Sequence, residues 1–466
     1  MADTPTPAYS VRIRVRMENR PGMLGELAIA IGAVGANISA LQGFEVKTAS
    51  LDEDVVVNCA SEAHQEQVRA AVEGIDGIQI LEFEDRTFHM HEGGKIEVLS
   101  LAPVRDVEDL SMAYTPGVAR VCMEIAKNPP AAHRYTIKKN TVAIVSDGTA
   151  VLGLGDIGPE GAMPVMEGKA LLFKHFAGVD AFPICLNTKD PEEIIETVLR
   201  LEPTFGGINL EDIAAPGAFE VEERLDECMD IPVFHDDQHG TAIVTLAALE
   251  NALKIVDKDM ADLKVVVAGV GAAGVAVSKI LMNAGVRNVI GADRQGAVHT
   301  SREGLNRSKQ WFAENTNPEG LSGSLTQIMP GADVFIGLSG PNLIERSDVE
   351  RMASNPIVFA MANPDPEIRP ELIQDVAAVI ATGRSDFPNQ INNVLAFPGV
   401  FRGALDAGAR RITENMKVAA ARAIASTVEP DELAPDFIIP SVFNPRVSVA
   451  VAEACAEAAR ADGVCR

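Results

Sequence analysis

The sequence predicts an α/β protein of several domains, and three observations support this prediction. An apolar strand runs into a turn with the spacing Gly269-x-Gly271-x-x-Gly274, followed by a helix and a second strand. Short apolar strands alternate with helical stretches from residue 141 to residue 382, which is typical of a parallel sheet covered by helices. The first 90 residues follow the order β-α-β-β-α-β. We therefore expect a Rossmann-type doubly wound domain, a second α/β domain and an N-terminal ferredoxin-like module.

The length of 466 residues is too great for a single domain. A boundary is expected at Gly93-Gly94, and the character of the sequence changes again near residue 241. We expect domains over residues 1–92, 93–240 and 241–430, with a C-terminal helical segment over residues 431–466 that packs on the core.

The composition argues against several classes of protein. The formal charge of −26 argues against a nucleic-acid partner, because such binding neutralises phosphates with a basic face. No apolar run reaches the roughly 18 residues of a membrane span, so we expect no membrane partner. The N-terminus lacks the basic start and the apolar stretch of a signal peptide, which favours a cytoplasmic protein. The six cysteines form no Cys-x-x-Cys pair, which argues against a disulfide framework or a zinc site.

The N-terminal module opens with an alternating strand over residues 9–16 and a helix over residues 23–34. The remaining elements are expected at residues 37–46, 54–59, 62–73 and 78–83. With its turn Arg20-Pro-Gly-Met-Leu and the segment Gly35-Ala-Asn-Ile, this module resembles an ACT domain. The resemblance implies a site for a small effector, often an amino acid, that regulates an attached enzyme. A purely oligomerising role is the alternative.

Four acids follow two buried strands in the middle of the chain. Glu211 and Asp212 come directly after one strand, and Asp236 and Asp237 come after the next. Because ligands bind beyond the carboxyl ends of parallel strands, these acids are candidates for one Mg²⁺ or Mn²⁺ site. Side chains alternate along a strand, so neighbouring acids share a site only if the backbone turns there. The alternative is that they cap helices or lie in solvated loops.

Two further residues are candidates for proton transfer. Lys169 is expected in the first turn of a helix that opens near Met166. The positive end of the helix dipole and burial would both lower the pKa of a lysine there, as a general base requires. Tyr114 is expected just outside a helix with Thr115 as its N-cap.

The glycine turn suits a dinucleotide, whose pyrophosphate would rest on the helix N-terminus beside Gly269, Gly271 and Gly274. Asp293 ends the next strand and would accept a hydrogen bond from a ribose hydroxyl, which favours NAD. Arg294 beside it would instead suit the 2′-phosphate of NADP, so the sequence leaves both cofactors open. Later strand ends place amides at the same edge, including those of Asn363 and Asn393, although asparagine in such loops is usually turn chemistry.

Together these motifs resemble malic enzyme, and most closely its short bacterial form. The matching motifs run in family order from about residue 95 to the end: Ala113-Tyr-Thr-Pro-Gly-Val, Ser146-Asp-Gly, Leu152-Gly-Leu-Gly-Asp, Glu167-Gly-Lys, Asn209-Leu-Glu-Asp, His235-Asp-Asp-Gln-His-Gly-Thr, Gly269-Val-Gly-Ala-Ala-Gly and Ala396-Phe-Pro-Gly-Val. The resemblance implies oxidative decarboxylation of L-malate to pyruvate and CO₂ with NAD or NADP and Mg²⁺ or Mn²⁺. It also implies a homodimer or a higher homo-oligomer.

The resemblance also implies roles for individual residues. Glu211, Asp212 and Asp237 would bind the metal, and Asp236 would support the lysine. Lys169 would be the general base and Tyr114 the general acid. Asn363 and Asn393 would hold the substrate.

One motif departs from the family pattern. Longer forms have an arginine before the Leu-Gly-Leu-Gly segment, where this chain has Thr149-Ala150. Another cation must then bind a substrate carboxylate, and Arg134, Lys138 and Lys139 are the candidates.

Two other functions remain as alternatives. A non-decarboxylating hydroxy-acid or amino-acid dehydrogenase would need neither the acid cluster nor Tyr114. An inert amino-acid or nucleotide sensor would need no catalytic residue at all.

Overall fold

The computed structural model describes residues 4–466, and the chain divides into two compact units, Met1–Val98 and Leu99–Arg466. The elements of the first unit are β1 (Thr6–Glu18), α1 (Met23–Ala33), β2 (Asn37–Val46), β3 (Ser50–Cys59), α2 (Glu62–Glu73), β4 (Ile78–Asp85) and α3 (Arg86–His91). Its first six elements follow the order that the sequence predicted.

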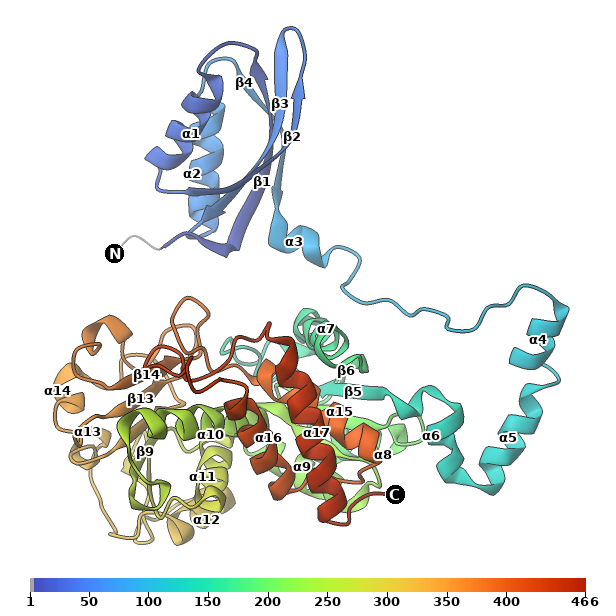
Figure 1. Ribbon diagram of the computed structural model, residues 1–466, viewed down its shortest axis with the longest axis vertical. Helices are drawn as coiled ribbons and strands as arrows, with labels where there is room; N and C mark the ends of the chain where they lie inside the picture. The colour runs from blue at the N-terminus through green and yellow to red at the C-terminus, as the bar shows by residue number, and fades with distance from the viewer. Residues whose placement is uncertain (1–3) are drawn as a thin grey trace. The chain divides into compact units, whose positions relative to one another are not determined.

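The first unit is an antiparallel sheet in the order β2-β3-β1-β4 (Figure 1). Alternation along β1 sends Val11, Ile13 and Val15 into a core that also contains Leu27 and Val68 from the two helices. The opposite face of β1 carries arginines that pair with acids of β3 and β4. The unit therefore has one apolar and one charged sheet face.

The second unit begins with a long segment of short helices: α4 (Val107–Ala113), α5 (Val118–Lys127), η1 (Pro129–Ala131), α6 (Ala132–Tyr135) and η2 (Ile137–Lys139). We call residues 99–131 the arm. No residue of the arm is buried, and the side-chain hydrogen bonds found in it join arm residues to one another.

A parallel four-stranded sheet in the order β6-β5-β7-β8 follows the arm. Figure 1 labels its strands β5 and β6. Its elements are β5 (Thr141–Ser146), α7 (Gly158–Ala177), β6 (Asp180–Cys185), α8 (Pro191–Leu201), β7 (Gly207–Leu210), α9 (Gly217–Cys228) and β8 (Val233–His235). Helices α8 and α9 pack on one face of this sheet through an apolar core. The carboxyl ends of β7 and β8 lie side by side, since Leu210 pairs with His235.

A six-stranded sheet in the order β11-β10-β9-β12-β13-β14 forms the next part. It contains η3 (Met260–Asp262), β9 (Lys264–Ala268), α11 (Ala272–Ala284), β10 (Asn288–Asp293), β11 (Gly296–Ala297), α12 (Arg307–Asn315), α13 (Leu325–Ile328), β12 (Val334–Gly337), α14 (Arg346–Val349), β13 (Ile357–Ala360), η4 (Pro370–Leu372) and β14 (Val379–Thr382). All strand pairs are parallel except β10 with β11. The strand order reverses at β9, which is the position where doubly wound sheets bind dinucleotides.

Helix α10 (Asp236–Val256) connects the two sheets. The character of the sequence changes near residue 241, but the helix begins five residues before that position, directly after β8. Asp236 and Asp237 therefore lie in its first turn, where negative charge is favourable.

The last elements are η5 (Asn393–Leu395), α15 (Phe397–Ala407), α16 (Glu414–Ser426) and α17 (Pro445–Ala461). Buried apolar residues of α17 such as Val451 and Cys455 lie against Gly399 and Gly403 of α15. Among the described residues, no helix is both long enough and apolar enough to cross a membrane.

Candidate active site

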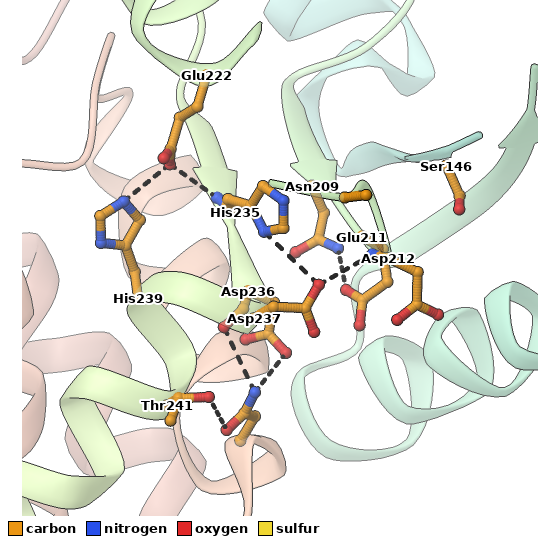
Figure 2. Close-up of polar contacts among 12 residues, drawn as sticks. Ser146, Asn209, Glu211, Asp212, Glu222, His235, Asp236, Asp237, His239 and Thr241 are labelled. Atoms are coloured by element: carbon orange, nitrogen blue, oxygen red, sulfur yellow. Dashed lines mark hydrogen bonds and ion pairs between the residues drawn. The ribbon is translucent and has the colours of Figure 1, made fainter. Parts of the chain in front are cut away.

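Three carboxylates meet where β7 and β8 end. Oxygen atoms of Glu211, Asp212 and Asp237 lie within 4.8 Å of one another. The backbone turns at Asp212, whose φ of 53° is in the left-handed region, so Glu211 and Asp212 reach the same site. The Asp212 amide donates to Asp237 Oδ2 at 2.9 Å, which joins the two strand ends (Figure 2).

The chemistry of this cluster fits a divalent cation. Burial and the neighbouring Asp237 raise the pKa of Asp212 to about 7. Burial and the neighbouring acids also raise the pKa of Glu211 well above its ordinary value, although Lys169 opposes this. Asp212 Oδ2 is buried and has no hydrogen-bond partner. A Mg²⁺ or Mn²⁺ ion would satisfy this oxygen and remove the repulsion.

Lys169 lies beside the cluster. Its Nζ atom is 2.7 Å from Asp236 Oδ2, 2.8 Å from Glu211 Oε1 and 4.2 Å from the ring centre of Phe397. The predicted position in a first helical turn is wrong, because α7 begins at Gly158 and Lys169 is well inside it. The predicted lowering of its pKa is not found either. Burial favours the neutral amine, but Asp236 and Glu211 outweigh burial and raise the pKa.

Tyr114 lies on the arm, where its side chain is 66% exposed. It ends α4, and the predicted N-cap at Thr115 is wrong because the next helix begins at Val118 after Gly117. No hydrogen bond or ring contact of the described residues joins Tyr114 to Lys169. The structure of one chain thus separates the two residues that the family resemblance pairs.

The three proposed carboxylate-binding cations lie at the wrong edge of the sheet. Arg134, Lys138 and Lys139 precede β5, whereas the acid cluster lies beyond the carboxyl ends of the strands. Lys138 is buried and its Nζ atom donates to the backbone carbonyls of Glu202 and Phe205. The sequence could not reveal these hydrogen bonds of Lys138, because the carbonyl groups belong to residues more than 60 positions away.

The two asparagines border the site in different ways. Asn393 donates to Asp236 Oδ2 at 3.2 Å, and Thr241 donates to the side-chain oxygen of Asn393 at 3.3 Å. Asn363 follows β13, and its backbone oxygen lies 3.4 Å from where a Cβ on Gly153 would be. The residue before Gly153 directs its backbone amide toward the Asp212 carboxylate. The loop after β5 therefore links Asn363 to the acid cluster.

The glycine turn has the shape expected of a phosphate-binding turn. A Cβ on Gly274 would lie 1.8 Å from the Gly269 carbonyl oxygen, and one on Gly269 would lie 2.8 Å from the Leu338 carbonyl oxygen. No atom lies within 4 Å of a Cβ built on Gly271, which caps α11. The helix N-terminus is thus open to a ligand at this glycine.

Asp293 ends β10, and its Oδ2 atom lies 2.7 Å from Arg302 and 2.6 Å from Lys309. Burial opposes ionisation, but the hydrogen bonds from these two cations outweigh it and lower the pKa of Asp293 to about 2. Arg294 is exposed. Sequence reasoning missed Arg302 and Lys309, since no periodic pattern connects them to Asp293.

Two more residues that the sequence did not reveal hold the site in shape. Glu367 is fully buried and accepts the backbone amides of Ser339 and Ala362, each at 3.1 Å. It thereby ties together the loops after β12 and β13, which lie at the cofactor edge of the sheet. Asn209 donates to Glu211 Oε2 at 2.8 Å and orients that carboxylate (Figure 2).

Comparisons with known proteins identify the two domains of the second unit. The malic enzyme N-terminal domain matches residues 93–226, and the malic enzyme NAD-binding domain matches residues 238–460. An NAD-dependent malic enzyme of Geobacillus stearothermophilus is 57% identical over 98% of this chain and 96% of its own length. A bifunctional malic/malolactic enzyme of Bacillus subtilis is 55% identical over 83% of this chain and 95% of its own length.

Solved structures give the same result. An NAD-dependent malic enzyme of Thermotoga maritima is 50% identical with a TM-score of 0.76, covering 79% of this chain and 98% of its own. A malic enzyme of Pyrococcus horikoshii is 48% identical with a TM-score of 0.79, covering 82% of this chain and 91% of its own. The two matching domains span most of the chain and contain the candidate site residues except Asp236 and Asp237, which lie between the two matches. The chain therefore belongs to the malic enzyme family.

Proposed function

We propose that this protein converts L-malate to pyruvate and CO₂ while reducing NAD⁺ or NADP⁺. The observation that supports this proposal best is the position of Lys169, which contacts both Asp236 and the metal-binding candidate Glu211. A base and a cation site are thus adjacent, as removal of a proton and a hydride from one alcohol carbon requires.

Each site residue has a role in this proposal. Glu211, Asp212 and Asp237 hold Mg²⁺ or Mn²⁺, which would polarise the C2 oxygen of malate and of the ketone that follows. Lys169 would take the proton of the C2 hydroxyl group, and a bound nicotinamide would supply the acceptor for the hydride of C2. Tyr114 donates a proton to C3 after CO₂ has left. Asn363 and Asn393 orient the substrate, and Asp236 keeps Lys169 in place.

The pKa of Lys169 bears on this role. The carboxylates of Asp236 and Glu211 raise it in the arrangement described above. A divalent cation bound to Glu211 would cancel much of the negative charge that Lys169 experiences, while burial would continue to favour the neutral amine. Metal binding would therefore prepare Lys169 to accept a proton.

The cofactor preference follows from Asp293. Its ionised carboxylate would accept a hydrogen bond from the ribose of NAD and would repel the 2′-phosphate of NADP. We propose that NAD is preferred and that Arg302 and Lys309, which keep Asp293 ionised, influence this preference more than Arg294 does.

We further propose that two copies of the chain assemble through the arm. Helices α4 and α5 have 7 and 10 residues and bury none of them. Helices this short gain most of their stability from packing, so a second surface must cover them. The arm exposes large apolar side chains, and so does the loop beside the acid cluster: Leu101, Val107, Met112 and Met123 on the arm, and Leu152, Leu154 and Ile157 on the loop. An arm that lies on the neighbouring copy would bring Tyr114 to that copy's Lys169.

The N-terminal unit is proposed to be an ACT-like regulatory module. Its β-α-β-β-α-β order supports this role. The relative from Geobacillus stearothermophilus matches 98% of this chain, so the match extends into this unit. Turnover by the full chain, measured with each of the twenty amino acids in turn, would identify an effector. If none changes KM or kcat, the oligomerising role is favoured.

The reaction is tested by incubating the purified protein with L-malate and Mn²⁺, separately with NAD⁺ and NADP⁺. Equal amounts of pyruvate and reduced cofactor are the expected products. Reduced cofactor without pyruvate would instead support a non-decarboxylating dehydrogenase, and no turnover would support an inert sensor. Lactate should be assayed as well, because the relative from Bacillus subtilis is named a malic/malolactic enzyme.

A further inference from the structure

A cavity of about 830 Å³ lies in the second unit, outside the site described above. Its walls come from α9, the first turn of α10, α11, α12 and the start of α16. Its lining includes neither the glycines of the phosphate-binding turn nor Asp293, the metal-binding candidates, Asn363 or Asn393. A molecule in this cavity would therefore occupy a place distinct from the proposed substrate and cofactor positions.

The cavity offers donors that form no direct ion pair or hydrogen bond with an acid of the described residues, although Arg411 interacts electrostatically with Asp226 and Lys279 with Glu414. Among residues 4–466, no carboxylate lies within 4 Å of the charged group of Lys279 or Arg411, and both residues line the cavity. Gln238 is only 3% exposed and also lines the cavity, and its Nε2 atom makes no hydrogen bond. A buried amide donor without an acceptor is unfavourable, so an acceptor supplied by a ligand would be stabilising.

Most acids of the wall are already engaged. Glu222 pairs with His239 at 2.8 Å, Glu414 with Lys417 at 2.8 Å and Glu223 with Arg307 at 3.0 Å. Burial raises the pKa of Asp226 above its ordinary value, although Arg411 opposes this. The donors that remain free therefore favour an anion.

An apolar surface lies beside these donors. Trp311 and Phe219 line the cavity, and the Lys279 ammonium group lies 4.7 Å from the ring centre of Trp311. A planar group could stack on Trp311 while an attached anionic group reaches Lys279. Trp311 is also the only tryptophan of the chain, so its fluorescence reports on this cavity alone.

The wall of the cavity is connected to the metal-binding turn. Glu222 Oε1 accepts the backbone amide of His235 at 2.9 Å and contacts His239 Nε2 (Figure 2). His239 in turn lies 3.0 Å from Lys417. The segment held between these contacts contains Asp236 and Asp237. A change at the cavity wall would thus reach the metal-binding turn through Glu222.

We propose that this cavity is a second binding site, for a small organic anion with a planar body, and that its occupancy alters metal affinity. The anionic group contacts Lys279, Arg411 and Gln238, and the planar group lies on Trp311. Binding itself does not depend on the proposed reaction, so it can be tested without turnover.

Phenyl phosphate is a suitable probe because it combines an anion with a ring. Titration into the full chain should change Trp311 fluorescence in a saturable way, with a Kd of about 1 mM or lower. Inorganic phosphate should bind more weakly, and benzyl alcohol, which has a ring without charge, should give no saturable change. Saturating NAD⁺ and Mn²⁺ should not displace the probe. Displacement by NAD⁺, or the absence of both a fluorescence change and a calorimetric signal, would overturn the second site.

A pair of variants locates the contact. Arg411→Met should weaken phenyl phosphate binding by at least about tenfold. Arg422→Met, on helix α16 shortly after Arg411 in the chain but paired with Glu250 and outside the cavity, should bind as the wild type does. Equal binding by Arg411→Met would overturn the proposed contact.

The connection to the metal is measured separately. By linkage, a bound probe should change the Kd for Mn²⁺, and Mn²⁺ should change the Kd for the probe by the same factor. Saturating phenyl phosphate should shift the Mn²⁺ affinity by at least about twofold. An unchanged Mn²⁺ affinity would refute the coupling while leaving the binding site in place.

Discussion

Lys169 is the residue on which the proposed chemistry depends most, and its replacement by arginine is the sharpest test of its role. Arginine keeps the positive charge between Asp236 and Glu211 but does not release its proton near neutral pH. Lys169→Arg should lower kcat for malate oxidation by about 10² to 10⁴, the usual contribution of a general base. Binding of NAD⁺, measured by calorimetry, should be unchanged.

The matched control for this variant is Lys174→Arg. Lys174 lies on the same helix and forms an exposed pair with Asp180, so its replacement should leave kcat within about twofold of the wild type. Near-normal turnover by Lys169→Arg would show that another group is the base. Lys169→Ala is a poorer test, because it would leave buried carboxylates without their partner at a cost of about 3 to 5 kcal/mol.

The acid cluster should make the proposed metal binding depend on pH. Asp212 has a pKa of about 7 without metal, and it must lose its proton to bind a cation. Above pH 7 the carboxylate is already ionised, whereas below pH 7 the metal must displace a proton. The Kd for Mn²⁺, measured by electron paramagnetic resonance, should therefore increase about tenfold for each unit of pH below 7. A flat affinity between pH 6 and pH 8 would contradict this prediction.

Asp293 should decide between the two cofactors. Asp293→Ser would remove the charge that repels a 2′-phosphate and would free Arg302 and Lys309 to bind it. The ratio of kcat/KM for NADP⁺ to that for NAD⁺ should rise by about 10- to 100-fold, as expected of two charge-assisted hydrogen bonds. Arg294→Ser should change this ratio by less than about threefold. A larger effect of Arg294→Ser would instead support the alternative that Arg294 binds the 2′-phosphate of NADP.

At the scale of elements, the sequence located some boundaries and misplaced others: α1 and α2 begin at the expected residues 23 and 62, whereas α7 does not begin where it was expected. Parallel strands buried on both faces leave a clear apolar run, so the ends of β7 and β8 and their acids were located correctly. Helix α7 begins at Gly158 rather than near Met166, since Pro164 is tolerated inside it although proline usually interrupts a helix. Lys169 therefore lies in the interior of the helix and not at its end. The positive end of the helix dipole cannot lower the pKa of Lys169 there.

The contacts between elements could not be predicted from the sequence. Glu367 lies in the loop after β13, and nothing local distinguishes it from a solvated acid. It is buried because it accepts amides from two separate loops, and such a contact depends on the three-dimensional arrangement of β12 and β13. The same is true of Lys138 and of the pairing of Asp293 with Arg302.

Replacement of Glu367 tests whether the loops after β12 and β13 contribute to cofactor binding. Glu367→Gln would keep the size of the side chain but leave one of the two amides without an acceptor oxygen. The variant should unfold with a free energy lower by about 1 to 3 kcal/mol, and KM for NAD⁺ should rise. The exposed Glu371 serves as the control, because Glu371→Gln should change neither value. An unaffected KM with reduced stability would show that Glu367 supports the fold alone.

At the scale of the whole molecule, the arm determines whether one chain has a complete active site. Tyr114 is exposed on helices that bury nothing, while Lys169 is buried beside the acids. Two arrangements would unite them: the arm closes over its own chain, or it lies on a second copy. The exposed apolar surfaces fit both arrangements, but the two differ in which chain supplies the proton donor.

Mixing two inactive variants distinguishes these arrangements. In a homodimer with exchanged arms, a mixed dimer of Tyr114→Phe and Lys169→Arg contains one site with both mutations and one site with neither. Equal mixing after unfolding and refolding should restore about a quarter of wild-type activity, since half of the dimers are mixed and each has one intact site. If the arm closes over its own chain, every site keeps one mutation and no activity returns. Restored activity would also show that Tyr114 and Lys169 act together at one site although one chain separates them.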